Sequence, residues 1–231
     1  MTRELARSSS GRDDDQQVCF ANVDYGPEFI ETELDSTVAA MAVCEYISRH
    51  RDEHQGFVVA CFDDPGMPAA SELTAKPVVG IAQAAAAFAT GLGKVGVLVV
   101  REGATGRVRE TLSKYSVDPS SMVVESIGLG VHGLSESQGD DLIVDKAQAL
   151  VARGAEVLLL ACAGFSSTAK EIGSACGVPV LDGVSCGIEM VKARLSLKEA
   201  GLWPGRRRTG PVPASQILGS RTPSIPWATT G

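Results

Sequence analysis

The chain has 231 residues, a formal net charge of −7 and a hydrophobic fraction of 44%. This length can bury a sizeable core in one large domain or two small lobes, and the composition is typical of a globular α/β enzyme rather than a disordered or repeat protein. An acidic surface repels a phosphate backbone. Nucleic acid is therefore not expected as a partner.

The apolar stretches, such as residues 95–100, are shorter than the roughly 20 residues of a membrane-spanning helix. No basic segment followed by an apolar one opens the chain. We therefore expect a cytoplasmic protein with no membrane partner, whose six cysteines are mostly thiols.

The first part of the chain contains four expected features. Residues 1–17 are polar and are expected to be flexible, and VCFANV at 18–23 predicts a short strand. Apolar residues at helical spacing predict a long helix within 26–50. The apolar run at 56–61 predicts a buried strand that delivers Cys61 to the turn FDDPG.

Strands and helices then alternate. The expected helices cover 69–75, 82–90, 107–115 and 142–154, and the expected strands 94–100 and 156–162. No element is expected in the weakly patterned stretch between the last two helices. This alternation predicts an α/β fold with a mostly parallel sheet and right-handed crossovers.

The most informative feature is an internal repeat. GFVVACFDDPG followed by PVVGIAQAAAAFA corresponds to EVLLLACAGFS followed by PVLDGVSCGIEMVKA. Pro77 follows Cys61 by 16 residues, and Pro179 follows Cys162 by 17. The repeat predicts two similar Rossmann-like lobes related by a pseudo-two-fold, with an active site between them at the ends of the strands, where ligands bind in such folds.

We expect the first lobe to comprise residues 1–93 plus 187–205, and the second lobe residues 94–186. Residues 206–231 are rich in Pro, Ser and Arg and are expected to form a flexible tail. The run Arg206–Arg208 is expected to be solvated.

Cysteines after apolar strands are usually small buried hydrophobes, but two at repeat-related positions favour a function. Each precedes a turn that opens a helix, where N–H groups and the helix dipole lower a thiol pKa. At the second site, Thr168 and Glu171 predict a capping box just beyond Cys162.

A pair of thiols suits racemisation, in which one group removes a proton and the other returns one on the opposite face. N–H groups of the loops would stabilise the intermediate enolate, so no metal or organic cofactor is required. There is no CxxC or HExxH, and His50, His54 and His132 are scattered, the first two facing solvent on a helix end. Four other cysteines lack a repeat partner: Cys19, Cys44 and Cys176 are expected to be structural, and Cys186 is a lesser site candidate.

Two further patterns have competing interpretations. GLGKVG at 91–96 matches GxGxxG, but its glycines close a helix and precede a strand, which argues against a dinucleotide loop. Asp63 and Asp64 either orient a substrate amide or cap the turn before Pro65. No triad arrangement favours a serine hydrolase.

The chain resembles the aspartate/glutamate racemase superfamily, and within it the hydantoin and allantoin racemases. The segments that carry the resemblance are GPEFIETELD at 26–35, VVACFDDPG at 58–66, PVVGIAQAA at 77–85, LLLACAG at 158–164 and GVPVLDGV at 177–184.

The resemblance implies two α/β lobes, a two-base mechanism without cofactor, and often a homo-oligomer. It makes Cys61 and Cys162 the catalytic pair, and the expected small-molecule substrate a five-membered cyclic ureide. Phe62, Asp63, Ala163 and Gly164 would line this substrate.

Two departures from the family pattern stand out. Members usually open with a strand and an Asn-Pro-Asn-type loop that contacts substrate, whereas this chain begins at MTRELA, where that loop would have finished. The first lobe is thus expected to lack a strand. Val100 and Arg101 stand where members often carry hydroxyl residues, which favours a more anionic ligand. Another superfamily reaction (amino-acid racemisation, maleate isomerisation or decarboxylation) and an inactive binding protein are the alternatives.

Overall fold

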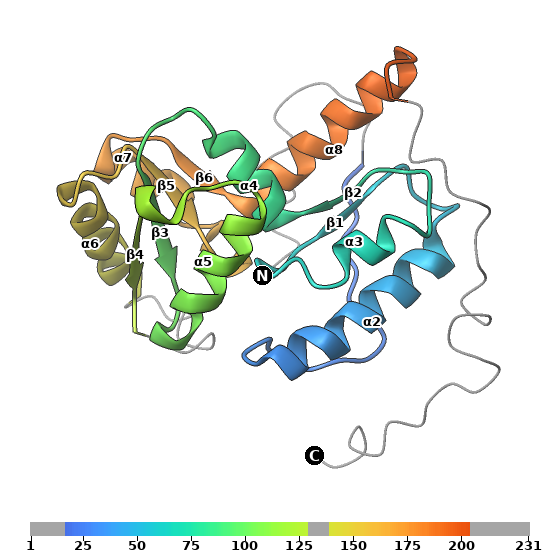
Figure 1. Cartoon of the computed structure of the whole chain (residues 1–231), viewed down its shortest axis with the longest axis horizontal. Helices are drawn as coiled ribbons and strands as arrows, with labels where there is room; N and C mark the ends of the chain where they lie inside the picture. Colours follow the sequence, from blue (N-terminus) through green and yellow to red (C-terminus); the bar gives the residue numbers. More distant parts are fainter. Residues whose placement is uncertain (1–16, 129–138, 204–231) are drawn as a thin grey trace. The chain divides into compact units, whose positions relative to one another are not determined.

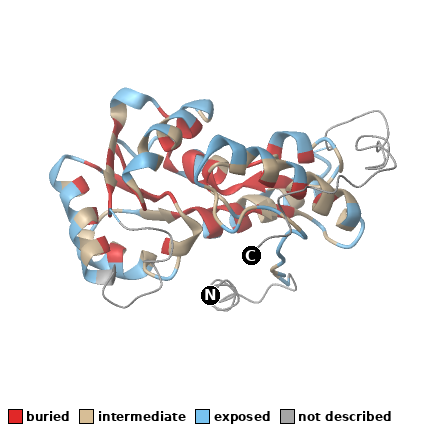
Figure 2. Ribbon diagram, turned by 90° about the horizontal axis from the view of Figure 1, so that it is seen from below, coloured by how far each residue is buried: buried red, intermediate tan, exposed pale blue. Residues whose placement is uncertain are grey.

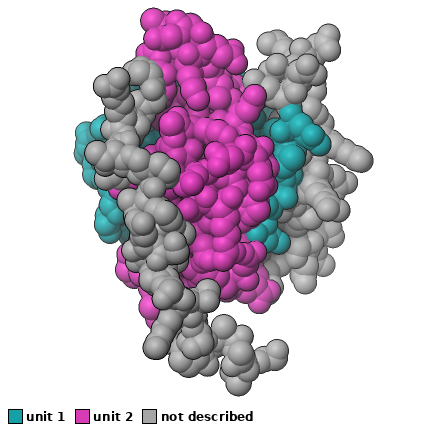
Figure 3. Space-filling view, turned by 90° about the vertical axis from the view of Figure 1, so that its right-hand side faces the viewer, with its two compact units in different colours: residues 1–22, 60–64, 80–190 teal, residues 23–59, 65–79, 191–231 magenta. Residues whose placement is uncertain are grey.

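The computed structural model describes residues 17–128 and 139–203 (Figure 1). The chain folds into two compact units, drawn in different colours in Figure 3. Unit 1 comprises residues 1–22, 60–64 and 80–190, and unit 2 comprises residues 23–59, 65–79 and 191–231.

The two units do not coincide with the two lobes expected from the repeat. Residues 60–64 and 80–93 group with 94–186, because the helix within 80–93 packs on the sheet of unit 1. The lobe boundaries themselves stay a prediction. The expected tail at 206–231 lies outside the described residues.

Unit 1 contains a four-stranded parallel sheet in the order β4-β3-β5-β6. The central strands β3 and β5 are buried along their whole length, as continuous apolar runs predict for strands covered on both faces (Figure 2). The strands are β3 (Val95–Val99), β4 (Met122–Ser126), β5 (Val157–Leu160) and β6 (Val180–Asp182).

Helices cover both faces of this sheet (Figure 1). Helices α4 and α5 lie on one face, and α6 and α7 lie on the other, in contact with β3, β4 and β6. Helix α8 begins directly after β6. The helices are α4 (Ile81–Ala89), α5 (Thr105–Lys114), α6 (Gly139–Ala152), α7 (Ala169–Cys176) and α8 (Gly183–Glu199). The α/β architecture with a parallel sheet is confirmed.

Unit 2 contains α2 (Glu33–His50) and a two-stranded sheet of β1 (Phe57–Val59) and β2 (Val78–Gly80), with the short helix α3 (Met67–Ala70) between the strands. Helix α2 begins with a capping box in which Thr32 and Asp35 satisfy each other's backbone N–H groups. Helix α3 packs against α2.

Three local predictions were wrong. Residues 18–23 form no strand, because these half-exposed residues pair with no neighbouring strand. Strands β2, β4 and β6 were not anticipated: β4 alternates in burial and lies at the sheet edge, and β2 and β6 have only three residues each. Helix α7 starts as expected, but Thr168 donates to the Phe165 carbonyl (2.9 Å) and makes no capping box. Among the described residues, no helix is long and apolar enough to cross a membrane.

Candidate active site

The two cysteines of the repeat both lie in unit 1. Cys162 follows β5 and begins the single turn η4 (Ala163–Phe165). This turn leaves the sheet where β3 and β5 are neighbours, although the helices that follow β3 and β5 cover opposite faces. Such a switch point is where ligands bind in open α/β sheets. Cys61 lies in the loop 60–64 that belongs to the same unit.

The two sulfur atoms have equivalent backbone partners. The N–H of Gly164 donates to Sγ of Cys162 at 3.4 Å. The N–H of Asp63 likewise donates to the sulfur of Cys61. In each loop the donor lies two residues after the cysteine, so the repeat extends to the hydrogen bond that would stabilise a thiolate.

Burial nevertheless dominates the acidity of both thiols. It raises the pKa of Cys61 to about 12, and the charges of Asp63, Asp64 and Cys162 act in the same direction. Burial also raises the pKa of Cys162. The expected lowering of the thiol pKa is therefore wrong, because desolvation outweighs the N–H donors. The influence of Cys162 on Cys61 places the two sulfurs within electrostatic range of each other.

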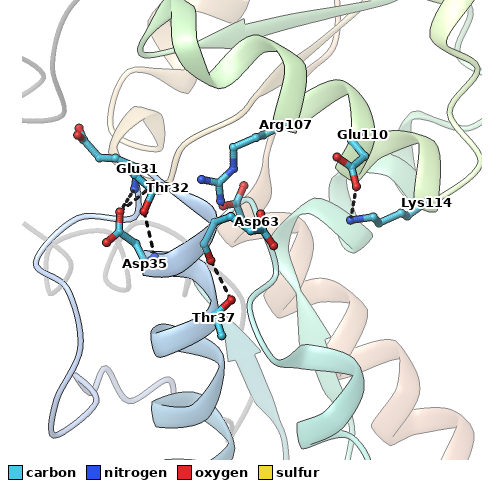
Figure 4. A network of polar contacts seen from close by, with 9 residues as sticks. Glu31, Thr32, Asp35, Thr37, Asp63, Arg107, Glu110 and Lys114 are labelled. Carbon is cyan, nitrogen blue, oxygen red and sulfur yellow. Dashed lines mark hydrogen bonds and ion pairs between the residues drawn. The ribbon is translucent and has the colours of Figure 1, made fainter. Parts of the chain in front are cut away.

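The residues next to the cysteines have distinct surroundings. Phe62 is 4% exposed and belongs to the core, whereas Ala163 and Gly164 are partly buried beside Cys162. The Asp63 carboxylate accepts from the guanidinium of Arg107 on α5, and both side chains are partly buried (Figure 4). Asp63, which the resemblance predicted to line the substrate, is thus held in an ion pair that no sequence pattern indicated.

Asp64 anchors the Cys61 loop to helix α4. Its buried carboxylate accepts from the N–H groups of Ala82 (3.0 Å) and Gln83 (2.8 Å), and from the hydroxyl of Tyr115. Burial raises its pKa to about 6 despite these donors. A Cβ on Gly80 would overlap the Asp64 carboxyl group, so glycine is required there. Asp64 therefore caps a helix distant in sequence, not the turn before the next proline.

Asp182 has the corresponding position at helix α8. Its buried carboxylate accepts from the N–H groups of Val184 (3.1 Å) and Ser185 (3.0 Å). The same oxygen accepts from the hydroxyl of Ser166 at 2.8 Å, which connects the Cys162 loop to α8. Neither Asp182 nor Ser166 was singled out from the sequence, although both lie in the repeat.

The remaining candidates have other surroundings. Cys186 is buried in the first turn of α8, the turn that Asp182 caps, and burial followed by the charge of Asp182 raises its pKa to about 12. His50 ends α2 with a side chain that is 33% exposed, and its ring lies 6.4 Å from that of His54, tilted by 37°. Gly91 and Gly93 follow α4 and precede β3, as predicted, whereas Gly96 lies within β3. In the described parts of the chain, no cluster of three or more His, Cys, Asp or Glu is arranged to hold a metal ion.

Comparisons with known proteins agree on one family. A family model described as Asp/Glu/Hydantoin racemase matches residues 1–191. A hydantoin racemase from Rhizobium meliloti is 33% identical over 73% of this chain and 72% of its own length. One from Pseudomonas sp. (strain NS671) is 31% identical over 84% of this chain and 80% of its own length. The solved structure of an allantoin racemase from Klebsiella pneumoniae superposes with a TM-score of 0.79 at 27% identity, over 94% of this chain and 92% of that one.

Proposed function

Because the chain belongs to the Asp/Glu/Hydantoin racemase family and is a racemase, we propose that it inverts the stereocentre of a five-membered cyclic ureide, a 5-substituted hydantoin or allantoin. The substrate class is supported by the hydantoin racemases and the allantoin racemase that the chain resembles. In such rings the C5–H is acidified by the neighbouring carbonyl. The reaction therefore needs only proton transfer.

The observation that carries the proposal is the pair of equivalent thiols, Cys61 and Cys162. They lie in one compact unit, the charge of Cys162 acts on the pKa of Cys61, and each sulfur accepts from the N–H two residues further on. A racemase needs a base and an acid on opposite faces of one carbon, and two like groups fulfil both roles. This is why no metal or organic cofactor is part of the proposal.

In the proposed mechanism the active form of the pair has one thiolate and one thiol. Because burial and the partner's charge hold the pKa of Cys61 high, loss of a second proton is strongly disfavoured once one thiolate has formed. The thiolate takes the C5 proton, and the C–H electron pair moves into the carbonyl to give an enolate. The other thiol then donates its proton to the opposite face. The negative charge moves from one sulfur to the other, and the N–H of Asp63 or Gly164 stabilises it there.

The test follows the optical rotation of single enantiomers of allantoin and of a 5-substituted hydantoin, corrected for spontaneous racemisation. We expect Cys61→Ser and Cys162→Ser each to lower kcat by at least about 10³-fold, since a serine hydroxyl ionises far less readily than a thiol and so supplies neither the anionic base nor an equally good proton donor. Because burial raises both thiol pKa values, the wild-type rate should rise with pH through the alkaline range.

Cys176→Ser is the matched control, because Cys176 is a partly buried thiol at the end of α7 outside both loops. It should retain full activity. Dialysis against a chelator should also leave the rate unchanged. Racemisation that survives either loop substitution would contradict the two-thiol mechanism, and activity on amino acids but not on ureides would contradict the substrate class.

A further inference from the structure

We propose that Asp64 and Asp182 are positioning residues, each of which sets the place of one thiol by anchoring its loop to the first turn of a helix. The part of this inference that concerns proton transfer rests on the proposed function. The anchoring itself rests on hydrogen bonds within unit 1.

In the first half, Asp64 lies three residues after Cys61 and has a φ of 49°. An aspartate rarely adopts this left-handed conformation unless its surroundings impose it. Here the carboxylate spans two N–H groups at the start of α4 and receives the Tyr115 hydroxyl. The loop that carries Cys61 is thereby tied to two helices at once.

In the second half, the carboxylate comes from the strand. Asp182 is the last residue of β6 and accepts from the first turn of α8, while Ser166, four residues after Cys162, donates to it. The loop therefore reaches the helix through a hydroxyl and a carboxylate instead of through its own carboxylate.

Alignment of the repeat shows that the same backbone groups are capped in both halves. Counted from Pro77 and Pro179, the N–H groups of Ala82 and Gln83 correspond to those of Val184 and Ser185. The residue that corresponds to Asp182 is Gly80, and the missing side chain leaves the space that the Asp64 carboxylate fills. The two anchors are thus alternative solutions to one geometric requirement.

The chemical consequence is accuracy of placement. Catalytic groups have to be held within about 0.5 Å of their productive position, and a misplacement of about 1 Å lowers the rate by about 100-fold. Short loops hold such a position only if they are tied to a longer, rigid element. Each anchor supplies that tie within four residues of a sulfur atom.

The first test compares Asp64→Asn with Asp182→Asn by alkylation with iodoacetamide, with Cys61 and Cys162 quantified by peptide mass spectrometry. This readout needs no racemase activity. Since burial is the largest cause of the raised pKa of both thiols, a loosened loop should expose its thiol and accelerate its alkylation. We expect about tenfold faster reaction at the local cysteine and less than about twofold at the other.

Charge and position are separated by further variants. Asp64→Glu keeps the charge but does not fit the cap, so it should accelerate Cys61 as Asp64→Asn does. Tyr115→Phe and Ser166→Ala remove one anchoring contact each while leaving the helix caps in place, and they serve if the aspartate variants do not fold. Equal changes at both cysteines, or no change in either, would overturn the proposal.

The second test measures racemisation of both enantiomers with hydrogen or deuterium at C5. Each anchor variant should lower kcat by about 100-fold with little change in KM. The primary isotope effect should increase for one enantiomer in the Asp64 variant and for the other in the Asp182 variant, because a displaced thiol makes its own proton abstraction limiting. The same enantiomer affected in both variants would contradict the assignment of one anchor to each thiol. Absence of any racemisation in the wild type would instead contradict the proposed function alone.

Discussion

The first N–H groups of α4 and of α8 are capped by a carboxylate in both halves of the repeat, but the carboxylate comes from the thiol loop in one half and from the strand in the other. At α4 the capping carboxylate is Asp64 in the loop and the strand contributes Gly80, whereas at α8 the strand contributes Asp182 and the loop a hydroxyl, Ser166. The first N–H groups of a helix need acceptors, and the space at each helix start admits one carboxylate. The repeat is therefore preserved in geometry rather than in residue identity.

The largest expected effect comes from placing a carboxylate on the strand while the loop still has its own, at the start of α4. Gly80→Asp directs a second carboxylate into the space of Asp64, where a Cβ alone would already overlap the existing carboxyl group. Overlap and an unpaired buried charge should cost at least about 3 kcal/mol in the free energy of unfolding. Urea denaturation measures this loss.

Addition of Asp64→Ser should reverse most of that loss, because the double variant has the carboxylate on the strand and the hydroxyl in the loop, as at α8. A double variant as unstable as Gly80→Asp alone would show that the two junctions are not interchangeable.

The next effect concerns the pH dependence of stability. Burial raises the pKa of Asp64 to about 6 from its ordinary value of 3.8, so the folded state favours its protonated form. Its contribution to stability is complete below pH 4 and is lost as the pH rises to about 6, by about 3 kcal/mol. Asp64→Asn should abolish this fall, as seen in denaturation curves across that range.

Asp118→Asn is the control for this titration. Asp118 is exposed, and hydrogen bonds from Ser120 lower its pKa, so its substitution should leave the fall between pH 4 and 6 in place. If Asp64→Asn retains the same fall as the wild type, the carboxylate at α4 does not titrate as inferred.

A smaller effect is expected where the two helix starts meet. Gly183 of α8 and Ile81 of α4 occupy corresponding repeat positions, and a Cβ on the glycine would lie 2.9 Å from Cβ and 3.0 Å from the carbonyl oxygen of Ile81. Gly183→Ala should therefore cost about 1–3 kcal/mol by thermal or urea denaturation. Gly106→Ala in α5, where no atom lies within 4 Å of the added Cβ, should instead gain up to about 1 kcal/mol. If the two variants change the free energy of unfolding equally, the structure accommodates the Cβ beside Ile81 without loss of stability.

The smallest effect concerns the ion pair found at the first loop but not at the second. Arg107→Ala removes one partner of Asp63 and should cost about 1 kcal/mol, because the pair is partly buried. It should also slow alkylation of Cys61, since the Asp63 charge raises the thiol pKa and the nearby Arg107 charge no longer offsets it. Lys114→Ala removes an exposed pair with Glu110 on the same helix (Figure 4) and should change neither quantity measurably. Faster alkylation in Arg107→Ala would contradict this role.

Much of the sheet could be predicted because its central strands are covered on both faces. The runs that became β3 and β5 are continuous and apolar, so burial can be inferred from composition alone. The edge strand β4 alternates in burial, whereas residues 18–23, which were predicted as a strand, pair with no strand of the described residues. Pattern could not distinguish these two cases, since strand pairing depends on neighbours distant in the chain.

The sequence by itself determined the α/β alternation, the repeat and the two cysteines at its corresponding positions, because these depend on residues close together along the chain. Only the tertiary structure decided that Asp64 caps α4, that Arg107 pairs with Asp63, and that both thiols hold their protons tightly. Desolvation and long-range hydrogen bonds arise from residues brought together by folding, and no local spacing encodes them.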